Sequence, residues 1–325
     1  MNFQWDESTK TLTVISNDDK IEGVQTEHKT DAIHIVIQGQ VKILGDQIFT
    51  SYSNVETIEL PDSIEEFGNN IITFSKIKEI HIPLNLKIYH SNGPLEYNFK
   101  LEKYTIDENQ QNFRVVDGVL YSKDMTKLVN IPPNYQSKIF TIPFGVTSII
   151  LSSVDYLQNI EQLIVPQTVN YIYGMLFRPK VIKKLIIYRN ESMNDQITWV
   201  NTYDFNFRDS PIQQKDIIYT NSSLYATYYK ENKTVVISST DENNRYEYQD
   251  EILSLDTSIT TIIYPKSVSK ISSSSFKTLS HNQFTVEDFT NYTTISIYNF
   301  KYTFLCHQYF SLPSLLISSL FLMLL

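Results

Sequence analysis

One spacing of apolar residues recurs along the chain and constrains its fold more than any other feature. In residues 160–177, apolar side chains stand six, three and one positions before Pro166 and three, six and eleven positions after it. The spacing recurs, with occasional substitutions such as Ser137, around five further anchors, which are Gln38, Pro61, Pro83, Pro143 and Pro265. The interval is 23 residues from 38 to 61 and from 143 to 166, and 22 from 61 to 83. Such a period indicates a stack of repeated coils.

The pattern within one period predicts how each coil folds. Two apolar residues at alternate positions before the anchor predict a short half-buried strand, which proline ends because it lacks an N–H. The three apolar places after the anchor predict a return leg whose side chains point inward. One coil can bury them only when a neighbour stacks on it, so we assign them to the core and not to chemistry. Frames with the strand half alone precede Asp107, Tyr188 and Glu287.

Three hairpins are predicted beside the coils. Residues 3–14 form one with a turn at 7–10, and it would cover the open end of the first coil. Residues 113–133 form another, with turn signals at Asp117-Gly118 and Lys123-Asp124, and we expect it to project from the coil. A third pair of strands is predicted at 217–229 and 234–237, within a region, 189–255, where the repeat is interrupted.

Three of these features together resemble the BspA-like leucine-rich repeat surface proteins of bacteria and microbial eukaryotes. The repeats match the family's Ile-Pro or Leu-Pro followed by Val or Ile three residues later, segment 113–133 is similar to its inserted hairpin, and segment 3–14 is similar to its opening hairpin. The resemblance covers residues 3 to 280, although 189–255 fits poorly and the family's small-residue and Cys features are mostly missing. It implies a β-rich leucine-rich-repeat solenoid with a parallel concave sheet. The role it implies is adhesion to host or matrix proteins at the cell surface.

The sequence divides into five segments on this basis. They are an N-terminal capping hairpin (1–25), leucine-rich repeats with the inserted hairpin at 113–133 (26–188), an irregular insertion with a hairpin (189–255), C-terminal leucine-rich repeats (256–300) and an apolar tail (302–325). Repeat domains exceed ordinary domain lengths without dividing, so one continuous domain is the default.

The uncharged stretch at 310–325 allows three interpretations. As a helix it would span about 24 Å, short of the roughly 30 Å hydrocarbon core, but a start near Tyr302 makes it long enough. A C-terminal membrane helix, a removable lipid-anchor signal and a buried cap of the solenoid all stay open. Residues 1–7 show no basic region and no apolar run, so no signal peptide is visible there. The tail favours a membrane, and the N-terminal segment favours an intracellular location.

Composition and motifs argue against catalysis and nucleic-acid binding. The net charge is -9 with only 27 basic residues, whereas phosphate neutralisation needs a basic surface. The six histidines lack metal-ligand spacing, and the single cysteine, Cys306, lies beside His307 with no carboxylate nearby. Phosphate-binding glycine loops and Gly-x-Ser-x-Gly are absent from the sequence. We therefore predict no enzymatic activity, no cofactor and no metal.

The candidate partner-binding residues stand two positions before each anchor, an outward place in the strand. This strand-face column consists of Glu59, His81, Thr105, Thr141, Ile164 and Ile186. Ile164 and Ile186 are predicted to be adjacent and exposed, which commonly marks a contact site, unless 189–255 folds over them. If a variant with both isoleucines replaced by lysine stays folded and still binds, the projecting hairpin at 115–129 is the next candidate surface.

A second column, five positions before each anchor, alternates in charge. This charge column consists of Glu56, Lys78, Glu102, Lys138, Glu161 and Lys183. Adjacent strands lie about 4.8 Å apart, so unlike charges would meet along it. We expect a ladder that favours the register and contributes modestly to stability, and not a ligand site.

The sequence as a whole predicts a non-enzymatic protein-binding repeat protein. The resemblance implies that its partner is a host or extracellular matrix protein at the cell surface, and the apolar tail at 302–325 would tether the protein to a membrane. The alternative is an intracellular leucine-rich-repeat scaffold without membrane attachment. Neither the strand-face column nor the charge column identifies the ligand.

Overall fold

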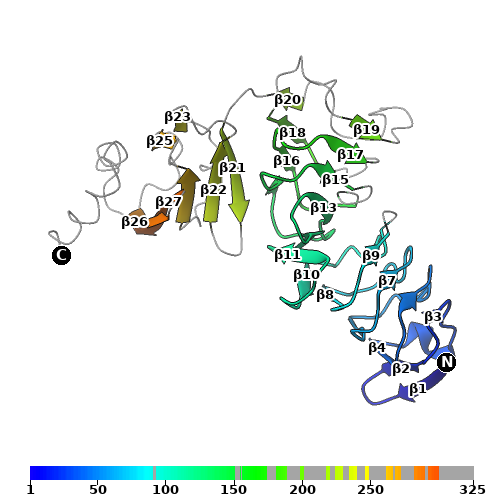
Figure 1. Ribbon diagram of the computed structural model, residues 1–325. Coiled ribbons are helices and arrows are strands. Elements are labelled where there is room, and N and C mark those ends of the chain that lie inside the picture. The colour runs from blue at the N-terminus through cyan, green and yellow to red at the C-terminus, as the bar shows by residue number, and fades with distance from the viewer. Residues whose placement is uncertain are drawn as a thin grey trace. The chain divides into compact units, whose positions relative to one another are not determined.

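The chain forms two compact units in the computed structural model, Met1–Thr220 and Asn221–Leu325 (Figure 1). The structure describes residues 1–90, 93–150, 154, 156–173 and 181–188. Beyond these it describes only strands, at 198–200, 217–219, 224–229, 234–239, 246–248, 261–265, 268–271, 282–289 and 292–299. The five-segment division stays a prediction.

In the first unit the strands before the anchors build one side of a β-solenoid. They are β4 (His34–Gln38), β6 (Thr57–Glu59), β8 (Glu79–Ile82), β10 (Lys103–Ile106), β14 (Ile139–Thr141), β16 (Gln162–Val165) and β18 (Lys184–Ile187), and β20 (Ile217–Tyr219) continues the series without an anchor. Their pairing is parallel and in chain order for β4–β6, β8–β10 and β14–β16–β18–β20, as predicted. The order is interrupted between β6 and β8 and between β10 and β14, which belong to different sheets.

The return legs form a second set of parallel strands that the sequence did not reveal. It consists of β3 (Lys20–Ile21), β5 (Ile43–Leu44), β7 (Glu66–Phe67) and β9 (Ile88–Tyr89), and then of β13 (Lys127–Asn130), β15 (Ser148–Ile149), β17 (Tyr171–Tyr173) and β19 (Thr198–Val200). Most occupy the fifth and sixth positions after an anchor. Two residues are too few to show an alternating pattern, so only their inward side chains were predictable.

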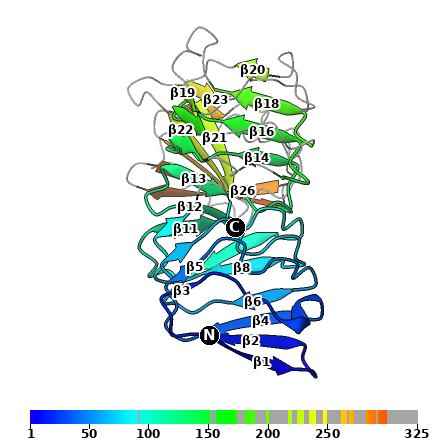
Figure 2. The same ribbon diagram turned by 90° about the vertical axis from the view of Figure 1, so that its right-hand side faces the viewer.

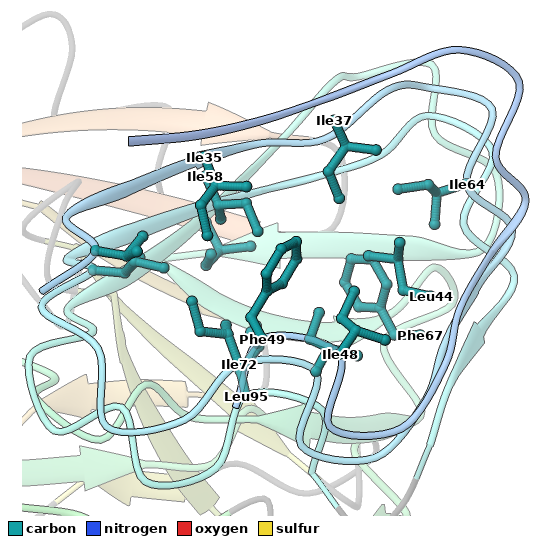
Figure 3. Close-up of a cluster of buried hydrophobic side chains, with 14 of the residues drawn as sticks. Ile35, Ile37, Leu44, Ile48, Phe49, Ile58, Ile64, Phe67, Ile72 and Leu95 are labelled. Atoms are coloured by element: carbon teal, nitrogen blue, oxygen red, sulfur yellow. The ribbon is translucent and has the colours of Figure 1, made fainter. Parts of the chain in front are cut away.

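The places that define the repeat fill the core. Leu44, Phe49, Phe67 and Ile72 are fully buried, and Figure 3 shows these side chains pointing into the space that the coils enclose. Two clusters make up this core, one from Leu12 to Val129 and one from Val119 to Ile187. The assignment of these positions to packing is confirmed.

The N-terminal hairpin covers the first coil, as predicted. Strand β1 (Asn2–Asp6) pairs antiparallel with β2 (Thr11–Ile15), and β2 pairs in parallel with β4. Figure 2 shows these strands in succession at the N-terminal end. Leu12 and Val14 of β2 are fully buried. The hairpin therefore shields the apolar side chains that an unpaired first coil would expose.

The inserted hairpin does not project, and that prediction is wrong. Strands β11 (Phe113–Val116) and β12 (Val119–Ser122) pair antiparallel around Asp117 and Gly118, and β12 pairs with β13, which joins β15 in the second sheet. Leu120 packs in the first core cluster, and Val119 and Tyr121 pack in the second. Both faces of β12 are therefore covered, and the hairpin is a structural link between the clusters.

A buried hydroxyl network ties this hairpin to the preceding coils. Tyr104 Oη donates to Asn130 Oδ1 over 2.8 Å, and the hydroxyls of Tyr89 and Tyr104 lie 3.2 Å apart. Burial raises the pKa of the Tyr104 hydroxyl well above its ordinary value. The hydroxyls therefore remain protonated donors, which the packed junction requires.

The second unit has a mixed five-stranded sheet. Its order is β21 (Leu224–Tyr229), β22 (Thr234–Ser239), β24 (Thr261–Pro265), β27 (Tyr292–Asn299) and β26 (Asn282–Phe289). The antiparallel β21–β22 pair confirms the third hairpin, although 217–219 belongs to β20 of the first unit. Strand β22 pairs in parallel with β24, and β23 (Tyr246–Tyr248) pairs in parallel with β25 (Val268–Ile271). The anchor Pro265 is the last residue of β24, and β25 follows it. The strand-only frame before Glu287 is not a coil, because β26 pairs antiparallel with β27.

Within the described ranges, no helix is both long and apolar enough to cross a bilayer. The tail at 302–325 lies outside those ranges, so its membrane helix stays a prediction.

Candidate partner-binding surface

The predicted strand-face column is aligned, but only part of it is exposed. Strand register places His81 opposite Thr105, and Thr141, Ile164 and Ile186 side by side. Glu59 and His81 are exposed and Thr105 and Ile186 are half-buried, whereas Thr141 is 5% and Ile164 1% exposed.

The expectation that Ile164 faces solvent is wrong for a physical reason. Ile164 and its neighbours Leu163 and Val165 are each 1% exposed, so β16 is buried on both faces. A strand covered on both faces reads as a continuous apolar run and not as an alternating one. The exposed, polar portion of the column is therefore limited to its N-terminal half.

The charge column forms ion pairs in its C-terminal half. Glu161 lies 3.4 Å from Lys138 Nζ and 2.9 Å from Lys183 Nζ. These three residues help to line a surface hollow of about 500 Å³. In the part of the chain that the structure describes, Glu56, Lys78 and Glu102 make no such pair. The predicted ladder is confirmed for three of its six members.

A second alternating column, four residues after the anchors, was missed. Lys42 lies 2.9 Å from Asp19, and Lys87 lies 2.7 Å from Glu65. The alternating signs of Lys42, Glu65 and Lys87 at equivalent places were visible in the sequence. This column also favours the register and has no geometry suited to a ligand.

Glu161→Gln is expected to destabilise the fold slightly at neutral pH and low salt. Lys183, by its hydrogen bond, and Lys138 hold the pKa of Glu161 below its ordinary value of 4.5. A carboxyl with a lowered folded pKa stabilises the fold above its unfolded pKa, and that contribution is lost as the pH falls through the folded value. The difference in urea midpoint should therefore disappear as the pH falls through the lowered pKa of Glu161, and it should also shrink in about 1 M salt. Glu56→Gln, without an ion pair among the described residues, is the control, and a difference that persists in acid would show a packing role.

Four aromatic side chains form a patch that the sequence did not predict. The aromatic patch consists of Phe74, Tyr97, Phe99 and Tyr156. Phe74 stacks on Tyr97 with ring centroids 5.2 Å apart, Tyr97 lies 4.5 Å from Tyr156, and Phe99 lies 6.2 Å from Phe74 and 6.3 Å from Tyr156. Phe74 is 59% exposed and Phe99 39%, and the tyrosines are half-buried. The rings form a contiguous apolar surface in contact with water.

The backbone of the patch is conformationally costly. Phe74, Tyr97 and Tyr156 have φ values of 58°, 61° and 64°. Each stands 13 or 14 residues after its anchor, where the first coil has Ser51 with φ 70°. Bulky side chains rarely adopt this left-handed conformation, and it costs on the order of 1 kcal/mol or more. Core packing does not explain why exposed aromatic rings occupy these corners.

The patch brings together residues distant in the sequence. Tyr97 and Phe99 follow the coil anchored at Pro83, and Tyr156 follows the coil anchored at Pro143. The hydroxyl of Tyr156 nevertheless donates to that of Tyr97 over 2.9 Å, across 59 residues of sequence. The intervening segment contains the inserted hairpin β11–β12–β13 together with β10, β14 and β15, so this contact depends on how the insertion fits between the two coils.

A buried amide fixes the two turns that carry Phe74, Tyr97 and Phe99. Asn98 is 1% exposed. Its Oδ1 accepts from the backbone N–H and the hydroxyl of Ser75 at 3.0 and 2.6 Å, and its Nδ2 donates to the carbonyls of Ile72 and Leu95 at 2.8 and 2.9 Å. The patch is therefore held in place before any partner arrives, which lowers the entropic cost of binding.

Asn98→Ala is expected to destabilise the first unit by about 1 to 3 kcal/mol, because buried carbonyl and N–H groups lose their partners. Urea unfolding followed by circular dichroism measures the effect. Asn109→Ala is the control, since Asn109 is exposed and bonds only to its own turn. An equal, small effect of both substitutions would mean that the Asn98 network is not a tie between the turns.

Comparison with known families identifies the repeat. A family model described as the BspA type leucine rich repeat region matches residues 27–137 and 220–318, with six copies. The chain belongs to this family. The resemblance noted from the sequence is confirmed.

Solved structures of other leucine-rich repeat proteins are similar to this BspA-type chain. The pneumococcal vaccine antigen PcpA is 20% identical with a TM-score of 0.42, and the match covers 57% of this chain but only 56% of PcpA. A leucine rich cell surface protein from Faecalibacterium prausnitzii is 14% identical with a TM-score of 0.32, covering 68% and 93%. No curated protein matches.

The remaining polar groups of this BspA-type repeat do not form a metal centre in the parts described. There, no group of three or more His, Cys, Asp or Glu side chains is placed to hold an ion. A hollow of about 480 Å³ on the second sheet is lined by polar groups that include Lys20 and Asp46. Glu66 and His90 also line it, and His90 Nε2 lies 2.9 Å from Glu66 Oε1. Cys306 and His307 lie outside the described residues.

Proposed function

We propose that this BspA-type repeat protein is a non-enzymatic module that binds a protein partner through the aromatic patch. The exposure of Phe74 in a left-handed backbone carries the proposal. A glycine would remove both the strain and the exposed ring, so stability alone does not account for phenylalanine there. Exposed, preorganised aromatic side chains are typical anchors of protein interfaces.

The double substitution Phe74→Ser with Phe99→Ser tests this function. We expect the melting temperature to stay within a few degrees, because both phenylalanines are exposed and lie outside the core clusters, and the left-handed turn accepts serine at Ser51. Partners that cross-link to the intact protein should be lost from this variant. Loss of an anchoring aromatic commonly costs at least about 2 kcal/mol, or roughly thirtyfold in affinity.

The strand-face column supplies the matched comparison. It stays a second candidate surface through its exposed members, so Glu59→Ser with His81→Ser removes the same number of exposed side chains from that face. Under the proposal this variant keeps its partners. If it loses them while the patch variant retains them, the partner surface is the strand face and the proposal fails.

Surface location and membrane attachment form a separate part of the proposal. The apolar composition of 302–325 and the family's surface proteins support attachment of the tail to a membrane and adhesion to a host or matrix protein. The alternative is an intracellular scaffold. Localising the full chain beside a form ending at residue 301 tests it, since equal soluble distribution of both would rule out tethering by the tail.

A further inference from the structure

We infer that the aromatic patch recognises an acidic polypeptide segment in which carboxylates flank aromatic or proline anchors; this rests on the proposed function. Two lysines adjoin the patch. Lys76 follows Phe74 by two residues and Lys100 follows Phe99 directly, and both are exposed. Exposed positive charge therefore stands within two residues of both exposed phenylalanines of the patch.

Lys76 and Lys100 differ from three other lysines of the first unit in their ion pairing. Lys42, Lys87 and Lys103 each pair with a carboxylate of an adjacent coil. Lys76 and Lys100 make no ion pair with any residue that the structure describes. Their charges are therefore available to a ligand, on a protein whose net charge is -9.

The remaining polar groups at the patch point to the same ligand chemistry. Tyr156 donates its hydroxyl hydrogen to Tyr97, so the hydrogen of the Tyr97 hydroxyl is left to donate outward. Two carboxylates directly precede patch residues in the sequence. Glu96 packs its side chain against Gly93, where an added Cβ would lie 2.2 Å from Glu96 Cγ, and Asp155 lies outside the described residues. The patch thus offers donors and cations to a ligand that supplies acceptors.

Other ligand classes fit these groups less well. A basic segment could stack on the rings through cation–π contacts, but Lys76 and Lys100 would repel it. A neutral oligosaccharide could stack on the same rings, but it would make no use of the two free charges. Charge complementarity therefore selects an acidic polypeptide.

Selection from a random 12-residue peptide library against the full chain tests the inference, followed by titration calorimetry of the enriched peptides. We expect enriched peptides to combine Asp or Glu with Tyr, Trp, Phe or Pro. Their affinity should fall at least about thirtyfold on Phe74→Ser with Phe99→Ser. It should fall about 5- to 20-fold on Lys76→Glu with Lys100→Glu, and this second loss should shrink in high salt.

Lys78→Glu with Lys127→Glu is the matched control, because both lysines are exposed and the change in net charge is identical. Equal losses in the two lysine variants would show a general charge effect and overturn the acidic ligand. Peptides that need Phe74 and Phe99 but carry no acidic bias would also overturn it, and would leave the proposed function standing. Enriched peptides that bind the phenylalanine variant as they bind the intact chain, or no enrichment at all, would contradict both.

Discussion

Gly39→Ala is expected to destabilise the first unit by at least about 3 kcal/mol. Gly39 follows the anchor Gln38 and has φ 105°, a conformation that L side chains rarely adopt. A Cβ there would lie 1.9 Å from the carbonyl oxygen of Ser16 and 2.8 Å from its carbon. Both are backbone atoms, so no side-chain rotation relieves the overlap. The ends of β2 and β4 would have to separate, breaking the Ser16 N–H to Gln38 carbonyl bond of 3.0 Å.

Substitutions at two other glycines separate the cost of the left-handed backbone from the cost of the steric overlap. Gly145 has φ 100° and no atom within 4 Å of an added Cβ, so Gly145→Ala should show the conformational cost alone, about 1 kcal/mol or slightly more. Gly23 has open space and an ordinary φ, so Gly23→Ala should be nearly neutral. Urea unfolding measures all three. In Gly39→Ala, hydrogen exchange should also accelerate in β1 and β2. Equal losses of stability in Gly39→Ala and Gly145→Ala would mean that the hairpin shifts to admit the Cβ at no further cost.

The sequence was sufficient to predict the strands and buried positions that recur in every coil. Ile35, Ile58 and Ile80 occupy the same place in three coils, and each is nearly fully buried. A side chain that recurs at one offset has the same environment in every coil, so the spacing predicts both the strand and its inward face. The parallel order of the strands follows from the same repetition.

Features that depend on neighbouring layers were not predictable in this way. The alternation of inward and outward positions along β16 placed Ile164 on the outward face, and we expected that face to be exposed. The continuous apolar run Leu163-Ile164-Val165 is instead typical of a strand covered on both faces. The hairpin was expected to project because its turn signals describe only its own two strands. Its burial depends on β13 joining the second sheet, which no local pattern encodes.

The aromatic patch was missed because its residues lie beyond the last place of the repeat. Phe74 and Tyr156 stand 13 residues after their anchors, and Tyr97 stands 14 after its own. The recurrence of an aromatic residue 13 or 14 positions after an anchor was a signal that could have been used. The contact between Tyr97 and Tyr156 could not have been predicted, because the insertion separates the two residues in the sequence.

Leu163→Ala is expected to cost about 2 to 5 kcal/mol, because it removes a fully enclosed side chain and leaves a cavity. Leu163 is 1% exposed, and strand register places it between Phe140 of β14 and Leu185 of β18. All three belong to the second core cluster. Contacts between nearest coils dominate the stability of a solenoid, so the loss should be largest in that cluster.

Urea unfolding measures the total cost of Leu163→Ala, and hydrogen exchange locates it. Exchange should accelerate in β14, β16 and β18 more than in β2 and β4, which pack in the first cluster. Gln162→Ala is the control, because Gln162 precedes Leu163 in β16 but is half-buried and outside the core clusters. A cost of Leu163→Ala below about 0.5 kcal/mol would place the side chain in water and overturn the inward assignment of this repeat position. Uniform acceleration across both clusters would instead show that the inserted hairpin couples them into one cooperative unit.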